Sequence, residues 1–390
     1  MVTVQHPERP AVGPAPPSDR RHLHEVDLFR LLTFASVIAV HVLSAATTAD
    51  DVGSNGGQLL LHFTREAFFT LTGFVLTFQA LRRPQRVTAF WRRRIPLVLT
   101  PYLAWTVVYS LLAIVTRPPG TPAPTVAQEL VVVGTDALEG TAWYHLYFLL
   151  VTLQLYLVFP ALVAGLRRLS GAGHVVVLVG ALVVQVVVSG LLAAPPATAF
   201  GAFLLVHGYA LLPAYLLYPV VGAVAALHLD RVQAAVLRWR WAIAGLVVVA
   251  IVVAEVLYVV AVRGGTAPAV AAAVFRPTTL PWFLVAVLGL YTLSLVVTAG
   301  WRPGGPARRA LAYASDRSFG IFLAHPLVLA GLLWVSGGWV AAVGSGVTLT
   351  ALYVGTVVGS VLLADVLRRL PVSAALTGRP ARQRARASRA

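Results

Sequence analysis

The stretch LFRLLTFASVIAVHVLSAA, residues 28–46, decides what kind of protein this is. It is apolar along almost its whole length, and a helix needs about 20 such residues to cross the hydrocarbon core of a bilayer. Two ionisable side chains, Arg30 and His41, interrupt it. Nine further stretches share this character and predict ten membrane-spanning helices in all: 28–46, 59–78, 95–115, 144–166, 174–192, 213–229, 241–262, 280–299, 318–334 and 343–363.

The composition of the whole chain agrees with that prediction. Of its 390 residues, 58% are hydrophobic and only 11% are charged, against roughly 25% charged in an average soluble protein. These values exclude an ordinary soluble domain, a disordered protein and a fibrous one, and predict an all-α, polytopic membrane helical bundle. The chain has no cysteine, which excludes disulfides, thiolate metal sites and a catalytic thiol.

One region allows two interpretations. Residues 196–229 fit one helix preceded by a re-entrant segment around His207, or a single long bent helix. The apolar pattern does not choose between them, because both bury the same residues.

The arginines predict the orientation of the bundle. All 30 basic residues are arginine, and if the ten spans alternate across the membrane, 25 of them fall in segments on the same side of the membrane as the N-terminus. Cytoplasmic loops of membrane proteins carry such an excess. We therefore expect a multi-pass protein of the plasma membrane with both termini in the cytoplasm and with loops 47–58 and 116–143 outside.

Both ends of the chain are predicted to be tails. Residues 1–27 are proline-rich and polar, without a signal peptide, which is typical of a disordered cytoplasmic tail. Residues 28–363 form the ten-helix membrane domain. Residues 364–390 form a basic cytoplasmic tail, and we expect it to contact anionic lipid rather than nucleic acid.

Several ionisable side chains fall inside the predicted spans, where they are costly and usually functional. Arg30 and His41 lie eleven residues apart, so they share one stripe of a helix, about 16.5 Å apart along its axis. The others are His62, Arg65, Glu66, His145, Glu255 and His325.

Each of these side chains also has a structural interpretation. Arg30 fits a snorkelling residue at the membrane surface, and His41 a buried histidine bonded to a neighbouring helix. Arg65 and Glu66 fit an ion pair. His325 precedes Pro326, and a proline frees a backbone carbonyl that the histidine can satisfy.

A metal site is not expected, because HxxxH and HExxH pairs are absent, and a Walker loop and a GxSxG elbow are absent as well.

Five motifs in order resemble the acyltransferase-3 family of membrane acyltransferases, including its surface-polysaccharide and intercellular-adhesin branch. They are Arg30-x10-His41, FFTLTGF at 68–74, FWRRR at 90–94, YHLYF at 144–148 and SFGIFLAHP at 318–326. Two positions depart from the family pattern. Thr72 replaces a serine, and Leu97 stands where a second arginine often follows Arg94.

The resemblance implies transfer of an acyl group, typically acetyl, from cytoplasmic acyl-CoA to a hydroxyl of a glycan or secondary metabolite, with no permanently bound cofactor. It implies that His41 is the general base or a transient acyl carrier. Arg30 then meets a phosphate of the donor. Arg93 and Arg94 add positive potential where the donor enters.

Arg65, Glu66, His145 and His325 are candidate substrate-binding residues. The alternative from another class is a membrane transporter that exports a glycan or small molecule, because ten helices with buried charges also describe secondary carriers.

Overall fold

The computed structural model describes residues 22–118, 120, 122, 124–337 and 345–381. Within these ranges the chain is helical and contains no β-strand, which confirms the all-α prediction. Nine described helices are long and apolar enough to cross a membrane, or ten if one bent pair counts as a span. The α-helices are α1 His24–Ala46, α2 Val52–Leu61, α3 Thr64–Arg82, α4 Val87–Val115, α5 Val126–Glu139, α6 Tyr147–Leu166, α7 Gly171–Ala193, α8 Ala199–His207, α9 Leu217–Leu227, α10 Leu229–Arg238, α11 Arg240–Arg263, α12 Pro268–Ala271, α13 Leu280–Ala299, α14 Pro306–Ser336, α16 Ser345–Leu367 and α17 Ser373–Thr377.

The ambiguous region 196–229 contains two short helices, α8 and α9. Helix α8 is separated from α9 by two 3-10 turns, Gly208–Ala210 and Leu212–Tyr215, with Leu211 extended between them. The single long bent helix is therefore not what forms. Helix α9 has 11 residues and is too short to cross a bilayer alone. It bends by 97° into α10.

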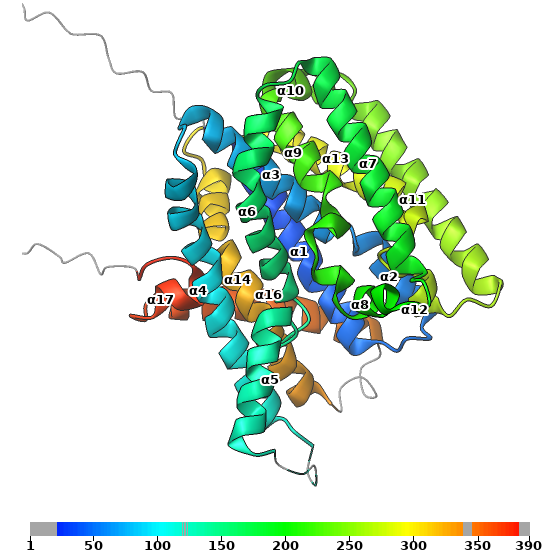
Figure 1. Ribbon diagram of the computed structural model, residues 1–390, viewed down its shortest axis with the longest axis vertical. Helices are drawn as coiled ribbons and strands as arrows, with labels where there is room; N and C mark the ends of the chain where they lie inside the picture. The colour runs from blue at the N-terminus through cyan, green and yellow to red at the C-terminus, as the bar shows by residue number, and fades with distance from the viewer. Residues whose placement is uncertain (1–21, 119, 121, 123, 338–344, 382–390) are drawn as a thin grey trace, which may run out of the picture.

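The helices differ in how much of their surface is covered. Helix α1 runs through the middle of the molecule, while α7 and α11 lie on one flank and α4 and α17 on the other (Figure 1). The outer helices expose apolar side chains, such as Val176 on α7 at 70% and Val248 on α11 at 60%. Exposed apolar surface of this extent fits contact with lipid.

Two glycines allow α3 and α9 to approach closely. A Cβ added to Gly73 would lie 2.1 Å from the carbonyl oxygen of Pro219, and one added to Gly222 would lie 1.9 Å from that of Thr70. Small residues at helix interfaces permit this backbone contact in membranes. The glycine of the FFTLTGF motif is thus explained by packing, and the contact fixes the helix that carries Arg65 and Phe68.

Parts of both predicted tails are helical in the described residues. Helix α1 begins at His24, so residues 24–27 belong to it, and Glu25 and Asp27 are buried. At the other end α16 continues to Leu367, and α17 packs against α4 and α14. Residues 1–21, which are most of the predicted N-terminal tail, and residues 382–390, the end of the predicted C-terminal tail, lie outside the described residues.

Candidate active site

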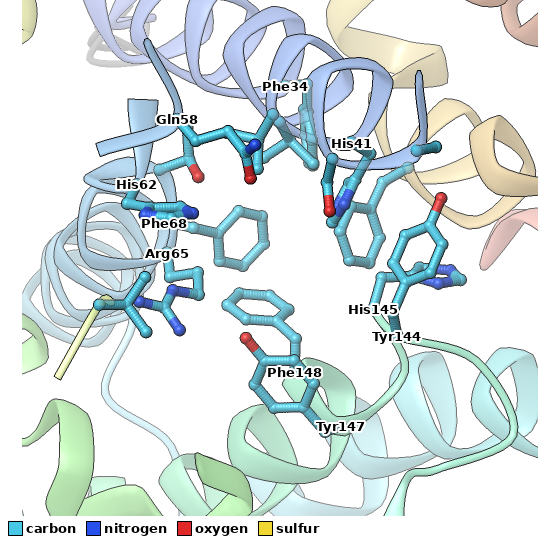
Figure 2. A pocket seen from close by; sticks show the side chains of 17 residues that line it. Phe34, His41, Gln58, His62, Arg65, Phe68, Tyr144, His145, Tyr147 and Phe148 are labelled. Carbon is cyan, nitrogen blue, oxygen red and sulfur yellow. The ribbon is translucent and has the colours of Figure 1, made fainter. Parts of the chain in front are cut away.

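A cavity of about 430 Å³ lies between α1, the α2–α3 break, the chain before α6, and α14. We call it the histidine cavity. Figure 2 shows His41, Tyr144 and His145 on one side of it and Gln58, His62 and Arg65 on the other. Its lining residues are Phe34, Val37, Val40, His41, Ser44, Ala45, Gln58, His62, Thr64, Arg65, Phe68, Tyr144, His145, Tyr147, Phe148, Val274 and Phe322.

Two histidines that line this cavity, His41 and His145, lie close to a third, His325, which does not line it. The ring centroids of His41 and His325 are 5.3 Å apart, and those of His145 and His325 are 5.4 Å apart. The ring of Tyr144 lies 4.3 Å from that of His41. His41, which lines the cavity and is only partly buried, is the member of the cluster best placed to touch a bound molecule.

His325 owes its orientation to the proline that follows it. Pro326 has no N–H, so the carbonyl of Phe322, four residues earlier, lacks its helical partner. Nδ1 of His325 lies 2.7 Å from that carbonyl oxygen and donates to it. The structural interpretation of His325 is confirmed in this respect. Nε2 is left with a lone pair and makes no hydrogen bond within the described residues.

His145 is placed by a tight turn. Gly140 ends α5 with φ at +77°, and a Cβ there would lie 2.6 Å from the Cα of Tyr147. The chain between them carries His145 into the interior, where 3% of it is exposed. Neither of its ring nitrogens makes a well-formed hydrogen bond within the described part of the chain. A buried polar group that lacks a well-formed hydrogen bond is costly, so the His145 ring can still accept or donate a bond to a bound molecule.

The opposite wall comes from the break between α2 and α3. The predicted span 59–78 is interrupted at His62 and Phe63, which places Arg65 in the first turn of α3. Arg65 lies 3.5 Å from Glu66 and stacks over the ring of Phe275 at 5.2 Å. The ion pair is therefore present. Arg65 also lines the cavity, whereas Glu66 does not.

A second cavity, of about 490 Å³, contains Arg30, Arg94 and Arg379, and we call it the arginine cavity. Arg30 donates to Asp27 at 3.5 Å and to Ser315 at 3.3 Å. Arg30 and Arg94 also line an adjoining cavity of about 580 Å³, which includes Arg93. The Arg30 side chain is thus paired in a cavity rather than spread along a lipid-facing surface.

Aromatic rings separate the two cavities. Phe34 and Phe68 line both of them, and their ring centroids are 5.6 Å apart. Phe148 packs 4.6 Å from Phe68, and Phe322 packs 5.6 Å from Phe34. We call these four phenylalanines the aromatic partition. Arg30 and His41 therefore belong to one helix stripe, as predicted, but stand on opposite sides of the partition.

One group of possible metal ligands exists in the described residues. His22, His24 and Asp27 bring one ligand atom each within 4.8 Å of one another. Both carboxylate oxygens of Asp27 already have partners, because His22 bonds one at 2.6 Å and Ser315 donates to the other at 2.7 Å. We assign this cluster a structural role in holding Asp27 beside Arg30.

The sequence analysis does not identify two important residues of these cavities. Tyr144 belongs to the YHLYF motif, but the motif does not place it beside His41, and Arg379 falls in the predicted basic tail. Arg379 lies in a part of the sequence that has no apolar pattern. Only the folded contacts reveal it.

Comparison with known proteins agrees with the motifs. The acyltransferase-3 family model, described as an acyltransferase domain, matches residues 23–365. The chain belongs to the acyltransferase-3 family. It is therefore a membrane acyltransferase with several spanning helices, acting on groups other than amino-acyl groups. The family's match ends before α17 and Arg379. No curated protein and no solved structure matches the chain.

Proposed function

We propose that the protein transfers an acetyl group from acetyl-CoA, supplied from the cytoplasm, to a hydroxyl of a glycan or secondary metabolite. The observation that carries the proposal is the pairing of the two cavities across the aromatic partition. A donor made of a charged nucleotide and a thin thioester arm suits an arginine cavity that shares the rings of Phe34 and Phe68 with a histidine cavity. Family membership favours this enzyme over the transporter alternative.

In the proposed reaction His41 acts on the acceptor. A ring nitrogen of His41 takes the proton of the acceptor hydroxyl while the oxygen bonds to the thioester carbonyl carbon. The carbon–sulfur bond then breaks, and the leaving thiolate takes the proton from His41. In the other route a ring nitrogen of His41 bonds to the thioester carbonyl carbon, and the CoA leaves as a thiol with the proton of the imidazole. The acceptor hydroxyl then takes the acyl group from that nitrogen, and its proton returns to the imidazole.

The histidine cavity also offers groups that orient the acceptor. Arg65 and His145 lie on opposite sides of it (Figure 2). A polyhydroxylated acceptor has several hydroxyls, which match a guanidinium and an imidazole as hydrogen-bonding groups. The proposal places the protein in the plasma membrane with both termini in the cytoplasm, so that the arginine cavity faces the source of the donor.

Reconstitution tests the proposal. The purified protein in proteoliposomes should consume acetyl-CoA and release free CoA only when a hydroxyl acceptor is present. Mass spectrometry of surface glycans and secreted metabolites from deletion and parent strains should identify the acceptor as the species that loses an acetyl group. Folded protein that transfers no acyl group from any acyl-CoA, while the deletion leaves every acylated species unchanged, would contradict it. A trapped acetyl group on His41 would select the two-step route.

A further inference from the structure

The chain after α16 forms a compact hook, residues 373–380, against the arginine cavity. Its first residue, Ser373, is fully buried, and its hydroxyl donates to the carbonyl oxygen of Arg379 at 2.9 Å. The indole of Trp105 in α4 donates to the carbonyl oxygen of Leu376 at 2.9 Å. These bonds fix the backbone on both sides of Gly378.

Gly378 seats the hook between α4 and α14. Its φ is +66°, a region that favours glycine. A Cβ there would lie 2.8 Å from the ring of Phe319 and 3.3 Å from the carbonyl oxygen of Leu97. The close contact brings the next residue, Arg379, beside Leu97, one helical turn beyond Arg94.

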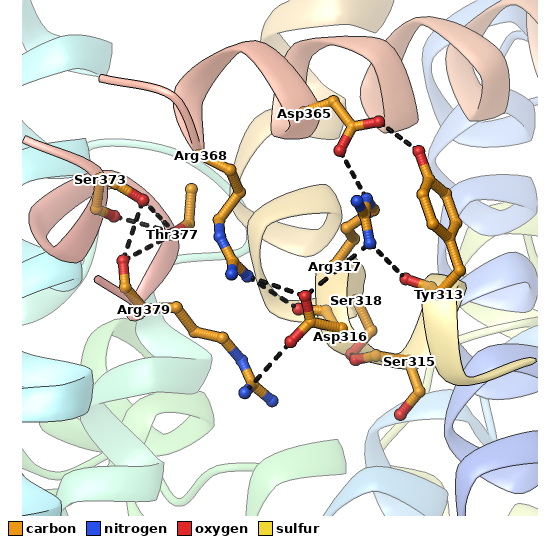
Figure 3. A network of polar contacts seen from close by, with 10 residues as sticks. All are labelled: Tyr313, Ser315, Asp316, Arg317, Ser318, Asp365, Arg368, Ser373, Thr377 and Arg379. Atoms are coloured by element: carbon orange, nitrogen blue, oxygen red, sulfur yellow. Dashed lines mark hydrogen bonds and ion pairs between the residues drawn. The ribbon is translucent and has the colours of Figure 1, made fainter. Parts of the chain in front are cut away.

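Figure 3 shows how the Arg379 side chain is held. Its guanidinium lies 3.2 Å from the Asp316 carboxylate, which Arg368 also contacts at 3.1 Å. Arg317 lies 3.7 Å from the same carboxylate and 2.6 Å from Asp365. The single carboxylate of Asp316 thus contacts three arginines and cannot neutralise the charge of all of them. Arg379 remains 52% exposed.

Three guanidinium groups from distant parts of the chain therefore line one cavity: Arg30 from α1, Arg94 from α4 and Arg379 from the hook. The Arg94 side chain donates to the neutral amide oxygen of Gln79, and within the described residues it forms no ion pair. Planar guanidinium groups match phosphate oxygens in charge and geometry. The cavity has more positive than negative side chains.

We propose that Arg379, together with Arg30 and Arg94, binds the phosphate groups of the donor, so that the hook is part of the donor site. This rests on the proposed function. It adds a binding residue from outside the segment that matches the family, and it names the part of the donor that the residue recognises.

The test compares two donors, acetyl-CoA and acetyl-pantetheine, which lacks phosphate. In the full-length protein Arg379→Gln should raise KM for acetyl-CoA about tenfold, the usual scale for one charged hydrogen bond, and leave kcat within about twofold. KM for acetyl-pantetheine should stay unchanged, and activity with that donor also shows that the variant is folded. Arg309→Gln, an exposed arginine of α14 that lines neither cavity, is the matched control.

An unchanged KM for acetyl-CoA, or an equal rise for both donors, would overturn the inference. Calorimetric binding of CoA separates it from the proposed function. One result would confirm the hook as a phosphate site and show that the proposed reaction is wrong. In it, the wild-type protein binds CoA tightly but transfers nothing, and the affinity for CoA falls in Arg379→Gln but not in Arg309→Gln.

Discussion

The two cavities on either side of the aromatic partition are built from different chemistry. The arginine cavity has guanidinium groups beside carboxylates, with Arg30 paired to Asp27 and Arg379 to Asp316. The histidine cavity has imidazole and phenol rings with few hydrogen bonds among them. Fixed charge suits the recognition of a phosphorylated donor, whereas a partly buried imidazole suits proton transfer. Under the proposed function, donor binding and acyl transfer therefore belong to separate compartments of one bundle.

The largest test of the difference between the two cavities is the orientation of the chain in the membrane. We expect both termini in the cytoplasm and loops 47–58 and 116–143 outside, because the arginine excess follows that topology. Fluorescent and phosphatase reporters fused after selected loops and at the C-terminus should report it. An extracellular C-terminus would turn the arginine cavity away from the cytoplasm and break the assignment of the two compartments.

The next largest effect is expected for His41→Ala. Removing the proposed general base should lower kcat by about 100- to 10,000-fold, while expression and thermal stability stay near those of the wild type. The assay is acetyl transfer by purified protein at saturating acetyl-CoA. His207→Ala, in α8 and outside the histidine cavity, serves as the matched variant and should keep its activity. Near wild-type turnover in His41→Ala would exclude this role.

Arg30→Lys probes the other compartment on the same helix. Lysine keeps the charge but loses the planar fork whose Nη1 reaches both Asp27 and Ser315. We expect kcat/KM for acetyl-CoA to fall roughly 30-fold. Arg309→Lys, outside the cavity, should have no effect. A fully active Arg30→Lys variant would show that charge alone is sufficient at this position.

The smallest expected effect is a difference in KM for acetyl-CoA between substitutions of the adjacent residues Arg93 and Arg94. Arg94 lines the arginine cavity, whereas Arg93 lines only the adjoining outer one. Arg94→Gln should therefore raise KM for acetyl-CoA about fivefold with little change in kcat, and Arg93→Gln should raise it less. The Arg93 effect should fade with added salt, because exposed charges are screened. Equal effects of the two substitutions would mean that only the summed potential matters.

Much of this arrangement was predictable because it depends on local periodicity. The shared stripe of Arg30 and His41 follows from helix geometry alone, and the bond from His325 to the Phe322 carbonyl follows from the missing N–H of Pro326. The glycine-dependent contact of α3 with α9 was not predicted, since it depends on where two backbones meet.

The parts that the sequence did not reveal depend on long-range contacts. Arg379 reaches its cavity only through the contacts of Trp105 and Phe319 with the hook, and a basic segment without apolar periodicity gives no sign of them. The break at His62 is hidden for a different reason, because no proline or glycine stands at residues 58–72 to mark it. Site residues on continuous helices were therefore easier to find than those placed by breaks and chain ends.

The aromatic partition has a further consequence for a cell that relies on ion gradients. Two cavities that meet inside one helical bundle have the layout of a pore, and a hydrated path through it would let protons and ions leak. The four phenylalanine rings offer no polar group to a passing ion, which would have to shed its water at a large cost in free energy. A slender uncharged thioester arm carries no such penalty. Under the proposed function, the same rings would insulate the membrane while admitting the one part of the proposed donor that has to reach the histidine cavity.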